Sequence, residues 1–178
     1  MSGDIMYSSS LVKRFIDAID INNKVWLNPC LTNCYAYALG IDLNVGRRII
    51  ELGEISGFDY KLRNKNDLET ALMMDSIRLN LNIERVDPDY EIKDNNKWLI
   101  AMYMTPFFYD QDINQKEFDN HFLWKTKNDN WSHKIGNTSI ITYKDDNGKK
   151  IDNPIDIDIS IDRNTPYNYI GSYLLTKK

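Results

Sequence analysis

Cysteine and histidine, the side chains that most often act as nucleophile and general base, occur only twice each in this chain of 178 residues. The complete set is Cys30, Cys34, His121 and His133. Cys34 is the candidate nucleophile, because a proline before it and an Ala/Leu run closed by Gly40 predict a short helix with this cysteine in its first turn. Backbone N–H groups at a helix start favour a thiolate, so we expect a lowered pKa for this thiol and donors for an oxyanion.

The two histidines are expected to meet in a hairpin. His121 opens one strand and His133 lies in the next, with 127–129 as a three-residue loop between the strands. In this register Leu123 faces His133, and His121 becomes the diagonal neighbour on the same face, about 7 Å away at Cα. A two-residue loop would place the imidazoles on opposite faces, since a shift of one residue inverts side-chain direction. Their pairing therefore depends on the length of the loop.

In this order, the features resemble the papain-like cysteine hydrolases of the NlpC type, a superfamily of cell-wall endopeptidases and amidases. A cysteine at a helix start is followed by a central strand, a strand that opens with histidine, and a second histidine 12 positions later. The resemblance covers residues 28–135. It implies that Cys34 is the nucleophile, His121 the general base and acid, and His133 the group that orients the first imidazole. The long interval between Cys34 and His121 implies an insertion at about 46–96.

A papain-type order of base and orienter gives other roles to the same residues. His133 is then the base, Asp152 orients it, and His121 is structural. Asn28, six residues before Cys34, lies where papain-like enzymes carry the glutamine of the oxyanion hole. We favour His121 as the base, because its strand is the one expected to adjoin the central strand and to reach the nucleophile.

Metal binding is weighed against the same residues. The two cysteines and two histidines make a complete Cys₂His₂ set, but structural zinc sites place their histidines three to five residues apart, which the spacing here does not match. The acidic run at 156–162 lacks the central glycine and the glutamate of an EF-hand loop. We expect no metal and no organic cofactor.

Hydrophobic spacing predicts the elements that must position these residues. It indicates a short helix over 11–19 and a longer one after a capping-box pattern at Asn66. The expected apolar face of the longer helix is made by Leu72, Met73, Ile77 and Leu81. A continuous apolar run at 98–104 predicts a central strand that is buried on both faces.

More strands are expected in the C-terminal half, at 121–126, 131–135, 139–143 and 169–175. The alternation of Ile and Asp over 151–162 predicts a segment with one apolar and one acidic face, as in a half-buried strand. The fold class is therefore α+β, with N-terminal helices packed on a largely antiparallel five- to six-stranded sheet, and the resemblance makes it papain-like or NlpC-like.

Length and charge bound the remaining possibilities. We expect a single domain over 1–178, and a net charge of −4 without a basic patch argues against nucleic acid as a partner. No run approaches the roughly 20 apolar residues of a membrane span, and the N-terminus lacks the apolar core of a signal peptide. A cytoplasmic protein is expected, with a non-classical export route or a viral source as alternatives. Oligomeric state is left open.

The sequence thus predicts a cysteine hydrolase, a peptidase or amidase, that acts on a peptide or amide substrate through an acyl-thioester on Cys34. Acyltransferase or deamidase chemistry could use the same Cys-His pair. The other class is a non-enzymatic interaction or structural protein on the same scaffold, in which the thiol is a small buried apolar group and the histidines are half-buried hairpin residues.

Overall fold

Three helices and eight strands make up the described part of the chain. The computed structural model describes residues 9–17, 19, 21, 32–41, 49–59, 62–106, 108–110, 115–127, 129–136, 138–160 and 165–178. The helices are α1 (Ser9–Asp17), α2 (Cys34–Ala38) and α3 (Lys65–Arg78). The strands are β1 (Leu81–Val86), β2 (Lys97–Met104), β3 (Phe108–Asp110), β4 (Gln115–Glu117), β5 (Asn120–Thr126), β6 (Ser132–Lys134), β7 (Ile141–Thr142) and β8 (Asn168–Lys177).

Six of the strands form one open antiparallel sheet in the order β1-β8-β2-β5-β6-β7, while β3 and β4 form a separate ribbon. The fold is therefore α+β, as the sequence predicts. The continuous apolar run is β2, which lies between β8 and β5 and is buried from Trp98 to Met104. This confirms the expectation of a central strand. The strand that carries His121 pairs directly with it.

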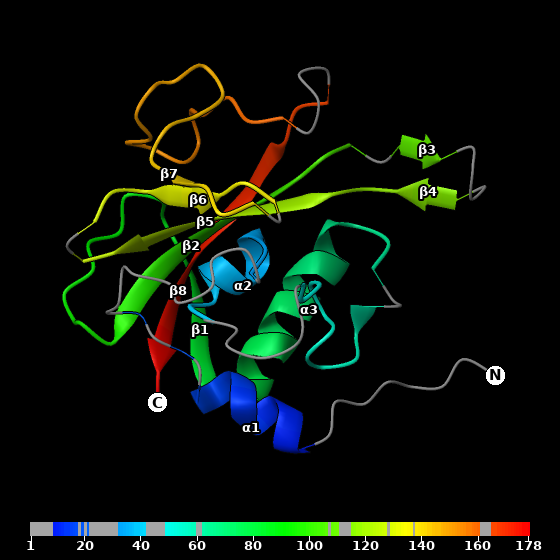
Figure 1. Cartoon of the computed structure of the whole chain (residues 1–178), viewed down its shortest axis with the longest axis vertical. Helices are drawn as coiled ribbons and strands as arrows, with labels where there is room; N and C mark the ends of the chain where they lie inside the picture. Colours follow the sequence, from blue (N-terminus) through cyan, green and yellow to red (C-terminus); the bar gives the residue numbers. More distant parts are fainter. Residues whose placement is uncertain are drawn as a thin grey trace.

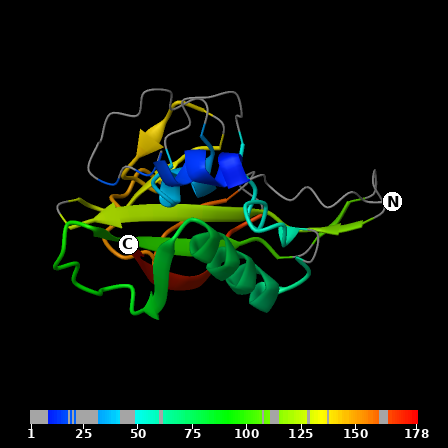
Figure 2. The ribbon, with the colours of Figure 1, turned by 90° about the horizontal axis from the view of Figure 1, so that it is seen from below.

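The two faces of the sheet carry different residues. Directly paired residues of an antiparallel sheet share a face, so Met102 and Phe122 lie on one side and Tyr103 and His121 on the other. The first side packs on the helices, with α2 against β5 and β6 and α3 against β1 (Figure 1). In the view of Figure 2, α1 lies above the strands and α3 below them, so the helices cover different parts of the twisted sheet.

Helix α3 differs in detail from its prediction. Its N-cap is Asn64 rather than Asn66, and the Asn64 side chain accepts hydrogen bonds from the N–H groups of Asn66 and Asp67. Met73 and Ile77, expected in the core, are 52% and 61% exposed. The buried face is made by Leu68, Ala71, Leu72, Asp75 and Ser76. The expected face was therefore right at Leu72 and wrong at Met73 and Ile77, because the helix turns the polar Asp75 inward, where its carboxylate has hydrogen-bond partners. Leu81 is buried as expected, but it opens β1 instead of lying on the helix.

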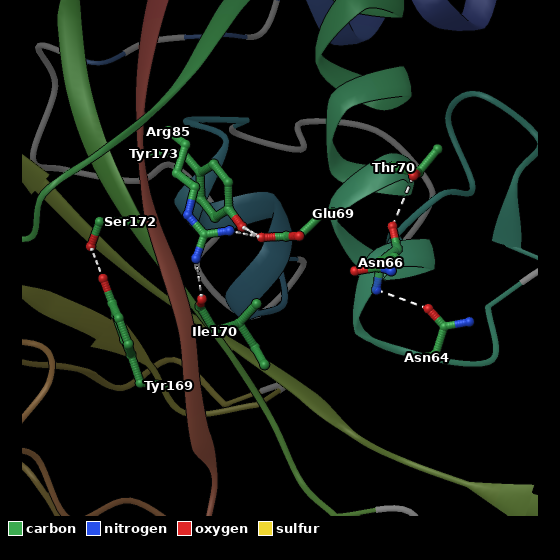
Figure 3. Close-up of polar contacts among 9 residues, drawn as sticks. All are labelled: Asn64, Asn66, Glu69, Thr70, Arg85, Tyr169, Ile170, Ser172 and Tyr173. Carbon is green, nitrogen blue, oxygen red and sulfur yellow. Dashed lines mark hydrogen bonds and ion pairs between the residues drawn. The ribbon is translucent and has the colours of Figure 1, made fainter.

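The region of the expected insertion supplies two elements. The sequence predicts the helix α3 but not the edge strand β1. A polar cluster joins these two elements to β8. The Glu69 carboxylate accepts hydrogen bonds from Arg85 and from the Tyr173 hydroxyl, the latter at 2.7 Å, and Arg85 also donates to Ile170 O at 2.9 Å (Figure 3). A Cβ at Gly171 would lie 3.1 Å from both the guanidinium and the phenol, so the absence of a side chain there leaves room for the cluster.

The Ile/Asp alternation after residue 150 does not form the expected strand. From 151 to 159 the chain turns, and Ile155 is 49% exposed although Ile151 and Ile159 are buried. A turn at Asn153, whose side chain accepts from the N–H of Ile155, breaks the alternation. Ile151 and Ile159 instead cover the face of the sheet that carries Tyr103. Within the part of the chain that the structure describes, no helix has the length and apolar character to cross a membrane.

Candidate active site

Cys34 opens α2, as the sequence predicts. The N-cap is Asn33, whose side-chain oxygen accepts from the N–H of Ala36 at 3.0 Å and whose amide donates to Ile50 O at 2.9 Å. Asn33 favours this position because its extended backbone and short amide satisfy a free donor of the first turn. The cap thus fixes where the helix begins and ties that point to the loop before α3.

Aromatic side chains seat α2 on the sheet. The ring of Tyr35 packs on Phe122 at a centroid distance of 4.9 Å, and that of Tyr37 packs edge-on to Trp124 at 5.1 Å. Beneath them, the buried Asp75 carboxylate accepts from the Tyr35 hydroxyl at 2.8 Å. It also accepts from two backbone N–H groups of the 50–57 loop. Asp75 therefore holds together α2, α3 and this loop.

The thiol of Cys34 lies against the backbone of β5, where its Sγ donates to Asn120 O at 3.9 Å. The backbone N–H groups of Phe122 and Tyr35 act to lower the pKa of this thiol. Asn120 is the residue before His121, so the thiol contacts the end of the strand that carries the base candidate. The helix of the thiol packs on the Phe122 face of the sheet, whereas His121 lies on the Tyr103 face. Among the described residues, neither imidazole forms a hydrogen bond with the thiol.

The electrostatics of the thiol reverse the sequence expectation. Burial raises the pKa of Cys34 to about 12, and the carboxylates of Asp119 and Glu51 add to the rise, against the opposing N–H groups. The prediction of a lowered pKa was wrong because the side chain is only 8% exposed, and α2, at five residues, has a small dipole. The thiol is therefore protonated at neutral pH.

The two imidazoles meet in the register that the three-residue loop predicts. Leu123 pairs with His133, and His121 is the diagonal neighbour on the same face. His121 Nε2 and His133 Nδ1 are 2.8 Å apart, with ring planes inclined by 84°. Both side chains are buried. This pairing confirms the loop-length argument.

A backbone oxygen determines which nitrogens carry the protons. His133 Nε2 lies 3.0 Å from Lys144 O, and a carbonyl can only accept, so this nitrogen is the donor. A neutral His133 then has a bare Nδ1, which accepts from the N–H of His121 Nε2. His121 is left with its lone pair on Nδ1.

Both imidazoles are neutral at physiological pH. Burial lowers the pKa of His121 to about 3, and the adjacent His133 contributes to the lowering. Burial also lowers the pKa of His133, against the opposing hydrogen bond to Lys144 O. The unliganded site therefore holds an uncharged thiol and an uncharged base rather than an ion pair.

Two residues that the sequence did not single out join the site. Tyr167 packs on His121 with ring centroids 5.3 Å apart, and its hydroxyl donates to the Asp119 carboxylate. The other oxygen of Asp119 accepts from the N–H of Asn120 at 2.9 Å. Asp119 could have been suspected from its place two residues before His121. Nothing in the local pattern around Tyr167 connects it with the histidines.

The other candidates do not reach this cluster. Asp152 pairs with Lys150 at 3.1 Å, and its side chain is 73% exposed. Since both nitrogens of His133 already have partners, the geometry gives no support to Asp152 as its orienting group. Asn28 and Cys30 lie outside the described residues. Within the described ranges, no three His, Cys, Asp or Glu side chains are grouped so that they could hold a metal ion.

Comparison with known proteins adds no family to this geometry: no protein-family model, no curated protein and no solved structure matches the chain. The class of protein must therefore be argued from the site itself. Its groups are a thiol and a neutral imidazole whose tautomer is fixed by a second imidazole, and acyl transfer through a cysteine uses a nucleophile and a base of these types.

Proposed function

We propose that this protein is a cysteine hydrolase, a peptidase or amidase of papain-like NlpC type, in which Cys34 is the nucleophile, His121 the general base and acid, and His133 the orienting group. The observation that carries the proposal is the hydrogen-bond relay from His121 through His133 to Lys144 O. The relay fixes the tautomer of His121 and leaves a lone pair on its Nδ1, which is the form of imidazole that a general base needs.

The reaction runs through an acyl-thioester. His121 Nδ1 accepts the thiol proton while Sγ attacks the substrate carbonyl carbon, and the C=O electron pair moves to the oxygen. The imidazolium then returns its proton to the departing amine as the C–N bond breaks. Water, deprotonated by the same imidazole, hydrolyses the thioester and frees Cys34. His133 stabilises the transient imidazolium by accepting a hydrogen bond from its Nε2–H, as the orienting partner does in other triads.

Burial makes the transfer of the proton part of the attack. Neither a separate thiolate nor a separate imidazolium is favoured in this site, because burial shifts both pKa values toward the neutral forms. The N–H groups of Phe122 and Tyr35 favour negative charge at the sulfur and so oppose part of the effect of burial. No metal or organic cofactor takes part in this proposal, and transfer to an acceptor other than water would give an acyltransferase or a deamidase.

One observation favours a second candidate function. The sulfur is buried, has a pKa of about 12 and already donates to Asn120 O. An inert thiol in this setting packs like a small apolar side chain. The second candidate is therefore a non-enzymatic interaction or structural protein that keeps the scaffold without the reaction.

Alkylation of Cys34 separates the two functions. In a Cys30→Ser background Cys34 is the sole thiol of the chain, and iodoacetamide labelling of the folded protein at pH 7 can be followed by mass spectrometry. The hydrolase predicts labelling that is lost in His121→Gln, because the base no longer takes the proton, and unchanged in the exposed-site control Lys149→Ala. Circular dichroism must show that each variant is folded. No labelling of the folded parent would contradict the hydrolase and favour the interaction protein.

A further inference from the structure

Tyr167 is held both at its backbone and at its side chain. The backbone N–H donates to Ile159 O at 3.0 Å, and a β-bridge between Ser160 and Pro166 fixes the chain just before this residue. At the other end of the side chain, the hydroxyl donates to the Asp119 carboxylate. The ring therefore has little freedom to rotate away from its place.

Asp119, which receives this hydroxyl, is itself fixed to the end of β2. Its N–H donates to Thr105 Oγ1 at 2.9 Å, and its carbonyl accepts from the N–H of Thr105 at 2.9 Å. Asp119 directly precedes β5, so the phenol is anchored next to the start of the strand whose imidazole it contacts. The contact with His121 is thus built from both ends.

His121 needs such a support. Among the described residues, His121 makes one side-chain hydrogen bond, from Nε2 to His133, so hydrogen bonding fixes the ring at one nitrogen only. Two rings pack on the imidazole, those of His133 and Tyr167, with centroids 5.0 and 5.3 Å away, and Tyr103 is its directly paired neighbour on β2. Of the two packed rings, Tyr167 is the one that takes no part in the hydrogen-bond relay.

We propose that Tyr167 is a positioning residue for the base: its ring, anchored on Asp119, holds the His121 imidazole with Nε2 on His133 and Nδ1 available to the thiol. The inference rests on the proposed function for its catalytic meaning. The geometric part, the orientation and tautomer of His121, is measurable whether or not the protein turns over a substrate.

Nitrogen-15 NMR of the imidazoles tests the geometric part, since the chain has only two histidines and a His133→Gln variant assigns their signals. The parent should show a single Nε2–H tautomer for His121. Tyr167→Leu removes the covering ring, so the His121 signals should average between tautomers and its titration midpoint should rise toward the ordinary range. Tyr167→Phe keeps the ring and loses the anchor, so its shift should be smaller and in the same direction.

Tyr169→Leu is the matched control. Tyr169 is another half-buried tyrosine next to the same sheet face, but its ring packs on Tyr103 at 5.7 Å and its hydroxyl bonds Ser172 at 2.8 Å (Figure 3). This variant should lower thermal stability without moving the tautomer or the titration of His121. If Tyr167→Leu also leaves both unchanged while it remains folded, Tyr167 is only a structural residue and the inference is wrong.

Alkylation of Cys34 in the same variants keeps the two proposals apart. If His121 assists the thiol, Tyr167→Leu should slow labelling by about tenfold or more, as misplacement of a catalytic group does. An NMR response with an unreactive parent would uphold Tyr167 as the support of His121 and contradict the hydrolase. A reactive parent with no response in either measurement would uphold the hydrolase and contradict the role of Tyr167.

Discussion

Burial sets the protonation of the central groups of this site. Cys34, His121 and His133 are each less than a tenth exposed, and each has a pKa moved in the direction that favours its neutral form. The sequence argument weighed the helix dipole and the neighbouring imidazoles, which act at short range on a solvated group. It could not weigh desolvation, because this depends on side chains brought in from distant parts of the chain.

The depressed pKa of His121 makes stability depend on pH. The ordinary pKa is 6.5 and that of the folded protein is about 3, so below pH 6.5 the unfolded chain binds a proton that the folded chain does not. The free energy of unfolding must then fall as the pH is lowered from about 6.5 toward 3, by up to about 1.4 kcal/mol per pH unit for this proton. Denaturant unfolding between pH 7 and pH 4 measures the slope.

The control for this prediction is His121→Gln, because Asp75 acts in the opposite direction. Burial raises the pKa of Asp75 above 3.8, so its folded form binds the extra proton on acidification and gains stability from it. Both proteins contain Asp75, so subtracting the unfolding free energy of His121→Gln from that of the parent at each pH cancels the effect of Asp75. The variant should lose less stability per pH unit than the parent. Parallel curves would show that His121 is not buried in its neutral form.

At the scale of elements, the two asparagine N-caps contribute differently to stability. Asn33 caps α2 and also donates to Ile50 O from a buried position, whereas Asn64 caps α3 at the surface. Loss of an exposed cap removes only the helix-end hydrogen bonds. Loss of Asn33 also leaves a buried carbonyl without its donor.

We therefore expect Asn33→Ala to cost about 2 to 3 kcal/mol of unfolding free energy and Asn64→Ala about 1 kcal/mol. Only the first should change the alkylation rate of Cys34, since only α2 begins with the thiol. Chemical denaturation and labelling measure the two quantities. Equal losses in the two variants would mean that the contact with Ile50 contributes nothing to stability.

The elements also show which parts of the site local patterns determine. The register of β5 and β6 follows from the three-residue loop, and the start of α2 from its capping residues, so both were predictable. The partner of His133 was not: Lys144 O is presented by a later turn of the chain, and nothing in the identity of residue 144 indicates it. Tyr167 reaches the site through its contacts with Asp119 and His121, which are distant in the sequence, and a local pattern cannot reveal such contacts.

The whole molecule is organised around β2, which has a partner along both edges, whereas β7 is a two-residue strand at the edge of the sheet. We expect the amides of β2 to exchange with solvent only when the entire protein unfolds, and those of β7 to exchange through local opening. Native-state hydrogen exchange at increasing denaturant distinguishes these cases by slope. A steep denaturant dependence shared by β7 and β2 would contradict this ranking.

The oxygen that accepts the hydrogen bond from His133 Nε2–H belongs to the main chain, and this determines which mutations the protein can tolerate. Any amino acid at position 144 presents the same carbonyl, so mutations of Lys144 should be tolerated by the relay. The hairpin closed by the bridge between Lys144 and Lys150 must instead keep its length. Substitutions at position 144 should therefore leave the relay intact, whereas insertions or deletions in the hairpin should displace the carbonyl and impair His121 as a base.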